Sequence, residues 1–279
     1  MTIHEPDHRG SPLATHASTE PSSQPGSQPA SQGQGSAVRI TGVSKRFGVG
    51  PSATLALDGV SLDVERGEFL CIVGASGCGK STLLNLVAGL DTPTIGTVET
   101  NGRVALMFQE AALLPWRTAV QNVELALKLR RVPRPERREQ ALALLELVRL
   151  REFADARPHE LSGGMRQRVA LARALGQGAD VLLMDEPFGA LDAITRDVLH
   201  DEVERVAAEQ RLTTIFVTHN VREAARLGDR IVLLSSRPGR VAAEFGVPVE
   251  RPRRIESPEV SAIAAEVMVR LREEVRRHA

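Results

Sequence analysis

The octapeptide GASGCGKS, at 74–81, is the feature that most restricts how this chain can fold. It follows a short apolar run, FLCIV at 69–73, and it leads into STLLNLVAGL at 81–90, which has the pattern of a helix. A glycine loop between a buried strand and a helix lets backbone N–H groups surround phosphate oxygens, while its lysine reaches the β- and γ-phosphates. The sequence therefore predicts a phosphate-binding loop, which kinases, GTPases and motor ATPases share.

Short apolar strands that alternate with helices predict an α/β core around a parallel sheet. Its predicted strands are FLCIV (69–73), VALMF (104–108), DVLLMD (180–185), TTIFVT (213–218) and RIVLLS (230–235). Two earlier segments, VRITGV (38–43) and LALDGVSLDV (55–64), alternate as half-buried strands do. The stretch from about 110 to 176 has a mostly helical pattern and predicts a second lobe.

Polar residues at the ends of two predicted strands indicate hydrolysis. Asp185 ends one strand and Glu186 follows it, so that the aspartate can hold Mg²⁺ and the glutamate can orient an attacking water. His219 follows TTIFVT, and the carboxyl ends of parallel strands lie at one edge of a sheet, which places His219 within reach of the same γ-phosphate. Two adjacent carboxylates favour hydrolysis over phosphoryl transfer to a small acceptor.

A second segment, ELSGGMRQR at 160–168, also has the pattern of an anion site. Ser162 is suited to cap a helix, and Gly163 and Gly164 leave backbone N–H groups uncovered. The chain therefore contains two candidate phosphate-binding segments.

Charge and composition exclude several classes of protein. The chain has 35 basic and 35 acidic residues, so it lacks the basic footprint of a nucleic-acid-binding protein. No run approaches the roughly 18 apolar residues of a membrane span, and no signal-peptide pattern is present. We therefore expect a soluble, cytoplasmic chain. Its two cysteines are too few for a disulfide framework: Cys71 is expected to be buried, and Cys78, inside the phosphate loop, is a candidate reactive thiol.

Three parts are predicted along the chain. Residues 1–36, rich in Ser, Pro, Gln and Gly, bury too little apolar surface to offset ordering and predict a disordered tail. Residues 37–250 form the main domain, and residues 251–279 form a helical extension whose helix starts at Ser257, with Pro258 at its first position. This helix packs on its own domain or on a partner. Its apolar face comprises Val260, Ile263, Val267, Leu271 and Val275.

Together these motifs resemble the ATP-binding subunit of ABC transporters. The resemblance rests on GASGCGKS, MFQE, LSGGM, VLLMDEP, GALD and VTHN, in this order, and it covers about residues 37 to 245. It implies a P-loop NTPase fold of the α/β class, with a RecA-like parallel-sheet core, an antiparallel β subdomain and a helical subdomain. It also implies that the cofactors are ATP and Mg²⁺.

The resemblance implies a role for each matching residue. Glu186 would be the catalytic base and His219 the switch residue at the γ-phosphate, with Gln109 and Lys80 also in the catalytic set. Phe47 would stack on adenine, where many relatives have tyrosine. The implied Mg²⁺ ligands are Ser81, Gln109 and Asp185. The implied nucleotide contacts are Phe47, Gly74, Ala75, Ser76, Gly77, Cys78, Gly79, Lys80, Ser81, Thr82, Ser162, Gly163, Gly164 and Asp192.

By the same resemblance, two copies of the chain pair head to tail around ATP. The LSGGM segment of one copy closes over the γ-phosphate held by the loop of the other, which gives the second anion site its ligand. Asp192 would contact the opposing subunit. With one phosphate loop and no membrane span, the chain would act at the cytoplasmic face of the cell membrane, with separate permease subunits and, indirectly, a solute-binding protein.

One stretch, EAALLPWRTAVQNVELAL at 110–127, resembles the ATPases of nitrate, taurine and aliphatic sulfonate importers. Leu113, Leu114, Pro115 and Trp116 would form an apolar patch that receives a permease helix; alternatively, Trp116 packs inside the helical lobe. SSRPGRV (235–241) resembles the same importers, and the short ETNGRVAL (99–106) favours aliphatic sulfonates. Nitrate, taurine and thiamine-precursor-type solutes stay open. A non-transport ABC ATPase is the rival class, although the long coiled-coil insertion or second cassette typical of such proteins is missing here.

Overall fold

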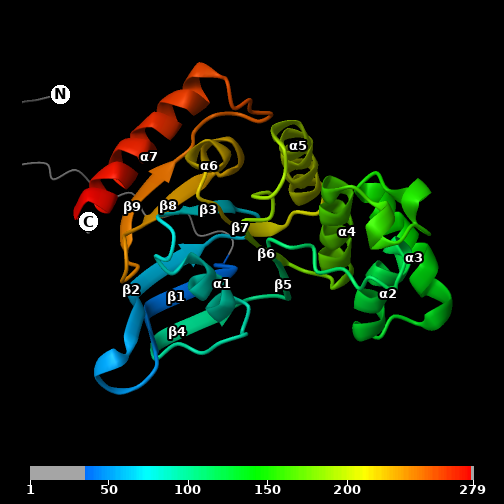
Figure 1. Ribbon diagram of the computed structural model, residues 1–279, viewed down its shortest axis with the longest axis horizontal. Helices are drawn as coiled ribbons and strands as arrows, with labels where there is room; N and C mark the ends of the chain where they lie inside the picture. The colour runs from blue at the N-terminus through cyan, green and yellow to red at the C-terminus, as the bar shows by residue number, and fades with distance from the viewer. Residues whose placement is uncertain (1–34, 278–279) are drawn as a thin grey trace, which may run out of the picture. The chain divides into compact units, whose positions relative to one another are not determined.

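The computed structural model describes residues 35–277 (Figure 1). The predicted disordered tail, 1–36, lies outside this range except for its last two residues. Within 35–277, no helix has the length and apolar character needed to cross a membrane.

A six-stranded sheet carries the phosphate loop. Its first five strands are parallel, and β9 extends the edge antiparallel to β8. In spatial order the strands are β5 (Val104–Met107), β6 (Val181–Asp185), β7 (Thr213–Val217), β3 (Phe69–Val73), β8 (Arg230–Leu234) and β9 (Val241–Gly246). The predicted α/β class with a parallel core is confirmed.

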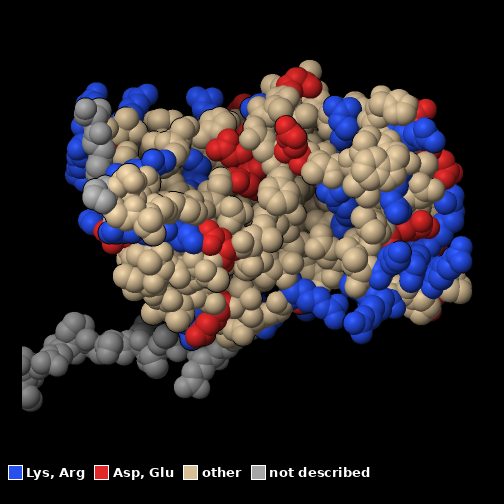
Figure 2. Space-filling model, turned by 60° about the horizontal axis from the view of Figure 1, so that its bottom comes forward, with Lys and Arg blue, Asp and Glu red and all other residues tan. Residues whose placement is uncertain are grey.

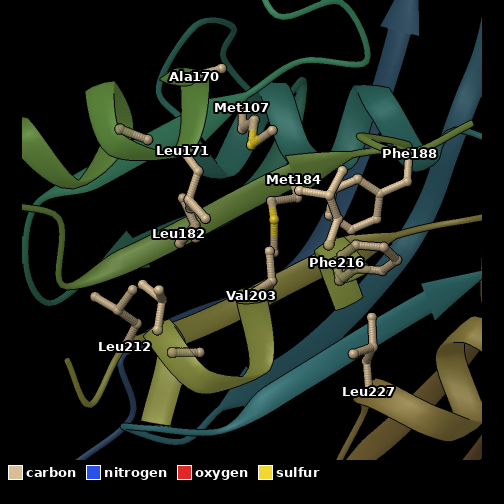
Figure 3. Close-up of a cluster of buried hydrophobic side chains, with 14 of the residues drawn as sticks. Met107, Ala170, Leu171, Leu182, Met184, Phe188, Val203, Leu212, Phe216 and Leu227 are labelled. Carbon is tan, nitrogen blue, oxygen red and sulfur yellow. The ribbon is translucent and has the colours of Figure 1, made fainter. Parts of the chain in front are cut away.

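Both faces of this sheet are covered, which explains why its strands are continuously apolar. Alternate residues of β3 enter different cores: Phe69, Cys71 and Val73 face one hydrophobic cluster, whereas Leu70 and Ile72 face another. Figure 3 shows the first cluster, in which strand residues meet side chains of α4 (Gly163–Gly176) and α5 (Ala193–Glu209). Cys71 is fully buried, as predicted.

The second cluster lies between the main sheet and a smaller antiparallel sheet. The smaller sheet has the order β2 (Thr54–Val64), β1 (Val38–Phe47), β4 (Ile95–Thr100). Helix α1 (Lys80–Val87) contacts β2 and β4 on one side and β6 on the other. The phosphate loop, which opens α1, is therefore held between the two sheets.

Three helices form the helical subdomain that the family resemblance implies. Helices α2 (Ala119–Leu129), α3 (Arg134–Leu147) and α4 pack on one another, with short 3₁₀ turns at Arg151–Phe153 and Pro158–Glu160. Thr118 begins α2 with a capping box, in which its hydroxyl accepts from the Gln121 N–H and the Gln121 side chain accepts from the Thr118 N–H.

The last helix, α7 (Pro258–Arg277), packs on its own domain, against α6 (Val221–Leu227) and β9 (Figure 1). Val260 and Val267 are fully buried in the first cluster. Val275, at the end of the predicted apolar face, is exposed. Val275 therefore does not share the burial of Val260 and Val267 on the predicted apolar face.

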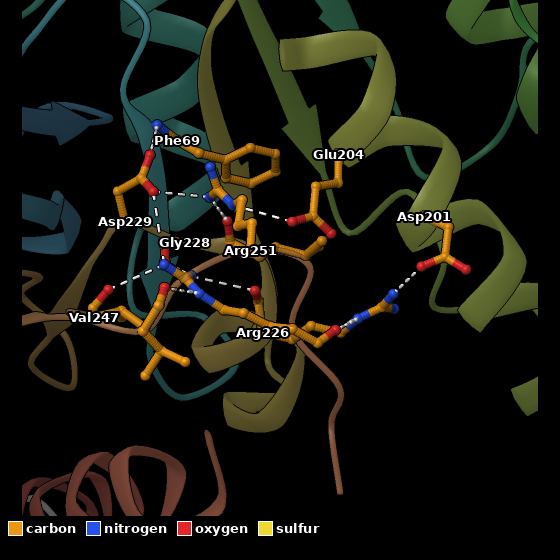
Figure 4. A network of polar contacts seen from close by, with 11 residues as sticks. Phe69, Asp201, Glu204, Arg226, Gly228, Asp229, Val247 and Arg251 are labelled. Atoms are coloured by element: carbon orange, nitrogen blue, oxygen red, sulfur yellow. Dashed lines mark hydrogen bonds and ion pairs between the residues drawn. The ribbon is translucent and has the colours of Figure 1, made fainter. Parts of the chain in front are cut away.

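Buried arginines fasten the segment between β9 and α7 (Figure 4). Arg253 donates to the main-chain carbonyls of Val247 and Val249. Ion pairs join Arg251 to Glu204 and Asp229, and Arg226 to Asp201. Because Asp201 and Glu204 belong to α5, this network ties the C-terminal segment to the helix that follows the GALD motif.

Two strands have no counterpart among the strands that the sequence predicted. β4 is exposed at almost every position, and β9 is only partly buried. Both are edge strands, held by main-chain pairing with β1 and β8. Neither strand has the apolar run or alternation that marks a buried strand.

Candidate functional site

The carboxyl ends of β3, β6, β7 and β8 meet at one edge of the sheet, and a cleft of about 280 Å³ opens there. Three parts of the chain line it: the antiparallel sheet, the phosphate loop and the segments after β6 and β8. The lining residues are Phe47, Thr54, Ala56, Ser76, Gly77, Gly79, Lys80, Ser81, Thr82, Glu186 and Arg237. Eight of the residues predicted from the sequence thus lie together.

The phosphate loop requires glycine at defined positions. Gly77 (φ 75°) and Gly79 (φ 104°) have left-handed backbone conformations that other residues rarely adopt. A Cβ on Gly74 would lie 2.8 Å from the Cys78 Sγ, and one on Gly79 would lie 2.9 Å from the Ala56 carbonyl oxygen. Gly79 begins α1 without a side-chain cap, so the first N–H groups of this helix are free for an anion.

Lys80 lies at the floor of the cleft. Its buried side chain donates to the carbonyl oxygens of Gly74 (3.0 Å) and Ala75 (3.1 Å), and its Nζ lies 3.9 Å from the Glu186 Oε1. The ammonium therefore holds the loop closed and faces the candidate catalytic carboxylate.

Glu186 occupies a strained position at the end of β6. Its φ is 46°, which is uncommon for a residue with a side chain, and its N–H donates to the Val217 carbonyl at the end of β7. Its Oε2 lies 3.0 Å from the His219 Nδ1. The structure thus places the two predicted catalytic groups in direct contact.

Asp185 lies deeper, at the tip of β6. Burial raises the pKa of its carboxyl group, although a hydrogen bond with the Ser81 side chain lowers that pKa and partly opposes the effect of burial. Two of the three predicted Mg²⁺ ligands therefore contact each other.

Gln109, the third predicted ligand, lies apart from the cleft. Its main-chain oxygen accepts from the Gln167 side chain of α4 (2.6 Å), and its own Nε2 faces Gly189 in the GALD turn, 189–192. Gln109 therefore bridges the helical subdomain and the segment that follows Glu186.

Phe47, at the end of β1, has one covered ring face. The ammonium of Lys45 lies 5.0 Å from the ring centroid and is itself held by Asp91 and the Thr92 carbonyl. The ring is 45% exposed, so it offers a flat apolar surface at the mouth of the cleft.

The prediction of a reactive thiol at Cys78 is not supported by its surroundings. The side chain is buried, and this burial raises the pKa of the thiol, although the nearby Lys80 opposes the increase. Thiolate formation is therefore disfavoured at neutral pH.

The LSGGM segment lies outside the cleft of its own chain, and so does Asp192. Ser162 caps α4 by accepting from the Met165 N–H (3.2 Å), as predicted, and Asp192 caps α5 by accepting from the Thr195 N–H (2.9 Å). A Cβ on Gly164 would lie 2.4 Å from the Thr195 Cγ2. This glycine therefore lets α4 approach α5 closely, a role that the anion-site pattern did not reveal.

Trp116 does not pack inside the helical lobe; its side chain is 68% exposed. The alternative that it is a core residue is therefore wrong. Pro115 is exposed as well, whereas Leu113 and Leu114 are half-buried.

A separate groove of about 490 Å³ lies between the core and the helical subdomain. It is mainly apolar and includes the exposed side chains of Leu90, Phe108 and Leu129, with Arg173 as a cation in its lining. Residues 113–116 do not line it. Several exposed basic residues lie at the end of α2 and in the first part of α3: Lys128, Arg130, Arg131, Arg134 and Arg138. Figure 2 shows lysines and arginines gathered at the α2–α3 end of the face.

Arg237 is the charged residue among the three cleft residues that the sequence analysis missed; the other two are Thr54 and Ala56. Its Nε donates to the Gly77 carbonyl oxygen (3.2 Å). The loop that carries it is fixed because Gly239 approaches the phosphate loop so closely that a Cβ there would lie 2.2 Å from the Cys78 carbonyl oxygen. The segment SSRPGRV follows a strand that ends at the same edge of the sheet, and this position could have indicated a cleft residue. The sequence analysis assigned no role to the arginine in it.

The chain matches the family model described as ABC transporter over residues 57–189. It is 49% identical to the aliphatic sulfonates import ATP-binding protein SsuB 1 of Burkholderia lata, over 84% of this chain and 72% of that protein. It is 42% identical to the uncharacterized ABC transporter ATP-binding protein MJ0412 of Methanocaldococcus jannaschii, over 85% of this chain and 92% of that protein. Its fold is similar to the dimeric, post-hydrolysis structure of the ATP-binding cassette MJ0796 bound to ADP and Pi, with a TM-score of 0.68, 34% identity, and coverage of 76% of this chain and 100% of that one.

Proposed function

The chain belongs to the ATP-binding proteins of the ABC transporter family, and from this premise we propose that it hydrolyses ATP to power the import of aliphatic sulfonates through a separate membrane permease. The observation that carries the ATPase proposal is the contact between Glu186 and His219 beside the phosphate loop.

The cleft supports ATP as the ligand. The uncapped N-terminus of α1 and the two cations of its lining, Lys80 and Arg237, present positive charge to phosphates. Phe47 offers a face for adenine, and a stacking contact tolerates other bases. ATP rather than another nucleoside triphosphate follows from the family.

Mg²⁺ fits the residues at the loop. Ser81 and Asp185 supply oxygen ligands of the kind that Mg²⁺ prefers, whereas Gln109 lies apart from the cleft and would have to approach it to add a third. Among residues 35–277, no cluster of three His, Cys, Asp or Glu side chains could hold a metal ion. The bound ion would neutralise charge on the β- and γ-phosphates.

Hydrolysis would use Glu186 to orient the attacking water and accept its proton. His219, 3.0 Å from that carboxylate, would fix its rotamer and contact the γ-phosphate. Lys80 would stabilise the charge that develops on the transferred phosphoryl group.

The active unit would be a head-to-tail dimer. Ser162, Gly163 and Gly164, at the start of α4, are not among the residues that line the cleft of their own chain, which fits a site that serves the other copy. In the dimer this site would close over the γ-phosphate of the other copy, so that ATP joins the subunits and hydrolysis releases them.

A helix of the permease would occupy the groove lined by Leu90, Phe108 and Leu129. Its apolar floor and the cations Arg173, Lys128 and Arg131 fit an amphipathic helix that carries acidic residues on one flank. Pro115 and Trp116 would extend the contact as a separate exposed patch. The protein would thus act at the cytoplasmic face of the membrane, and it would meet a solute-binding protein only through the permease.

Growth of a deletion strain on single sulfur or nitrogen sources tests the solute. We expect loss of growth on alkanesulfonates, restored by the wild-type gene but not by a Lys80→Ala variant, with growth on sulfate, taurine and nitrate intact. Loss of growth on nitrate or taurine alone would leave the ATPase proposal standing and show that the solute is a different one. Intact growth on all of these sources would contradict the assignment of aliphatic sulfonates.

A further inference from the structure

An ion pair between a buried carboxylate and a half-buried arginine lies behind the candidate catalytic residues. Glu223, at the start of α6, is 5% exposed, and its Oε1 lies 3.4 Å from the Nε of Arg196 on α5. Its Oε2 accepts a hydrogen bond from the Thr218 hydroxyl (2.7 Å). Because Thr218 directly precedes His219, the pair is bonded to the turn that carries the switch histidine.

The other end of the pair reaches the GALD turn. The Nη2 of Arg196 donates to the main-chain carbonyl of Leu191 (2.8 Å), next to Asp192. One arginine side chain therefore connects the His219 turn to the segment proposed to meet the opposing subunit.

Arg196 and Glu223 line a small cavity together with the candidate catalytic carboxylate. Its volume is about 30 Å³, enough for a single water molecule, and its lining includes Arg196 and Glu223 together with Glu186, Gly189 and His219. The pair thus forms part of the wall behind Glu186, outside the nucleotide cleft itself.

Arg196 is the arginine that forms the ion pair with Glu223. His200 also lies near, with its Nε2 3.8 Å from Glu223, but burial, together with Arg226 and Arg196, lowers the pKa of this histidine to about 3. His200 is therefore neutral at physiological pH. Burial also raises the pKa of the Glu223 carboxyl, an effect that the Thr218 hydrogen bond and Arg196 oppose.

Stability alone is a poor explanation of such a pair. An ion pair with a buried carboxylate is often no more stabilising than apolar residues of the same volume, because the carboxylate must lose its hydration. Its value here lies in the geometry it fixes between two turns that flank the reaction site.

We propose that Arg196 and Glu223 form a positioning unit that holds the His219 turn and the GALD turn in fixed relation, so that Glu186 is correctly oriented only when both turns are in place. Neither residue would touch ATP. The inference rests on the proposed ATPase function, which ATP hydrolysis by the full-length wild-type protein tests separately. A wild-type protein that fails to hydrolyse ATP would refute that function. The comparison of variants tests only the role of the Arg196–Glu223 pair.

Steady-state ATP hydrolysis by the full-length protein tests the unit, with Arg196→Gln, Glu223→Gln and the double variant. We expect each single change to lower kcat about tenfold or more, since small displacements of catalytic groups are costly, while KM for ATP changes by less than about twofold. The double variant should lose no more than the worse single variant, because both changes break one unit. Unchanged kcat in a folded single variant, or losses that multiply in the double variant, would overturn the proposal.

Glu202→Gln is the matched control. Glu202 is also a buried carboxylate on α5, paired with Arg205 at 2.7 Å, but it contacts neither turn. We expect the thermal stability of Glu202→Gln to fall without a comparable loss of kcat. If Glu202→Gln loses as much kcat as Glu223→Gln, the role of the Arg196–Glu223 pair is only structural. If Glu223→Gln does not fold, Thr218→Val removes the hydroxyl that donates to Glu223, together with the hydrogen bond that this hydroxyl accepts from the Asn220 N–H (2.9 Å). The same loss of kcat is expected, whereas full activity would overturn the proposal.

Discussion

The two cations of the nucleotide cleft come from loops that are distant in the sequence. Lys80 belongs to the phosphate loop itself, whereas Arg237 is brought to Gly77 by a turn that follows β8. A residue of this kind is difficult to assign from its motif, because its position depends on the close packing of Gly239 against the loop. Residue identity alone gives Arg237 no more weight than the neighbouring Arg240.

Arg237→Ala should weaken ATP binding. A hydrogen bond to a charged group contributes about 1.5–3 kcal/mol, so we expect the Kd for ATP to rise about tenfold or more. Fluorescence titration with a nucleotide analogue or calorimetry measures this change. Arg240→Ala is the control, since Arg240 is exposed and pairs with Asp58 away from the cleft lining. Equal Kd values for both variants would show that Arg237 does not contribute to ATP binding.

At the scale of elements, the contact between α4 and α5 depends on one glycine. Gly164 is buried, and the Thr195 methyl group occupies the space where a Cβ would lie. Thr195 also bonds to Asp192, which caps α5. The N-terminus of α4, where the anion site is proposed, and the GALD turn are therefore packed together.

Gly164→Ala should lower the free energy of unfolding by about 1–3 kcal/mol, because the added methyl group overpacks this contact. Thr195→Ser removes the opposing methyl but keeps the hydroxyl that bonds to Asp192. We expect the double variant to regain most of the lost stability in chemical denaturation. A Gly164→Ala variant as stable as the wild type, or a double variant that recovers nothing, would show that the contact is not tight.

The elements differ in how well the sequence predicted them. The buried strands β3, β6, β7 and β8 were found because a two-sided core demands continuous apolar residues. The edge strands β4 and β9 were missed because main-chain pairing, which leaves no side-chain pattern, holds them. Likewise, the loop motifs predicted the residues that meet at the cleft, whereas the Arg196–Glu223 pair arises from tertiary packing of two helices, and no local pattern marks it.

At the scale of the whole molecule, a net charge of zero conceals an uneven distribution. Lys128, Arg130 and Arg131 lie together at the end of α2, beside the groove. None of the three forms an ion pair with a carboxylate of the described part of the chain, 35–277. This surface is therefore free to attract an acidic partner.

Reversing two of these charges, with Lys128→Glu and Arg131→Glu, should weaken association with the permease. Attraction across the interface would become repulsion, so we expect co-purification of the permease subunits to fall and to lose its dependence on salt. Reversal of Arg272 and Arg276, two exposed arginines on α7, is the control. If both double variants retain the permease equally well, the basic end of α2 is not part of the docking surface.

In the proposed dimer, ATP joins two copies of this chain through sites that neither copy completes alone. Glu186→Gln tests it most directly, because loss of the base should lower hydrolysis about 100-fold or more and leave ATP bound. We predict that light scattering after size-exclusion chromatography shows a dimer of this variant with ATP and Mg²⁺, a monomer without nucleotide, and a monomer with ATP when Ser162→Arg is added. A monomer under all three conditions, with ATP bound, would contradict the head-to-tail account.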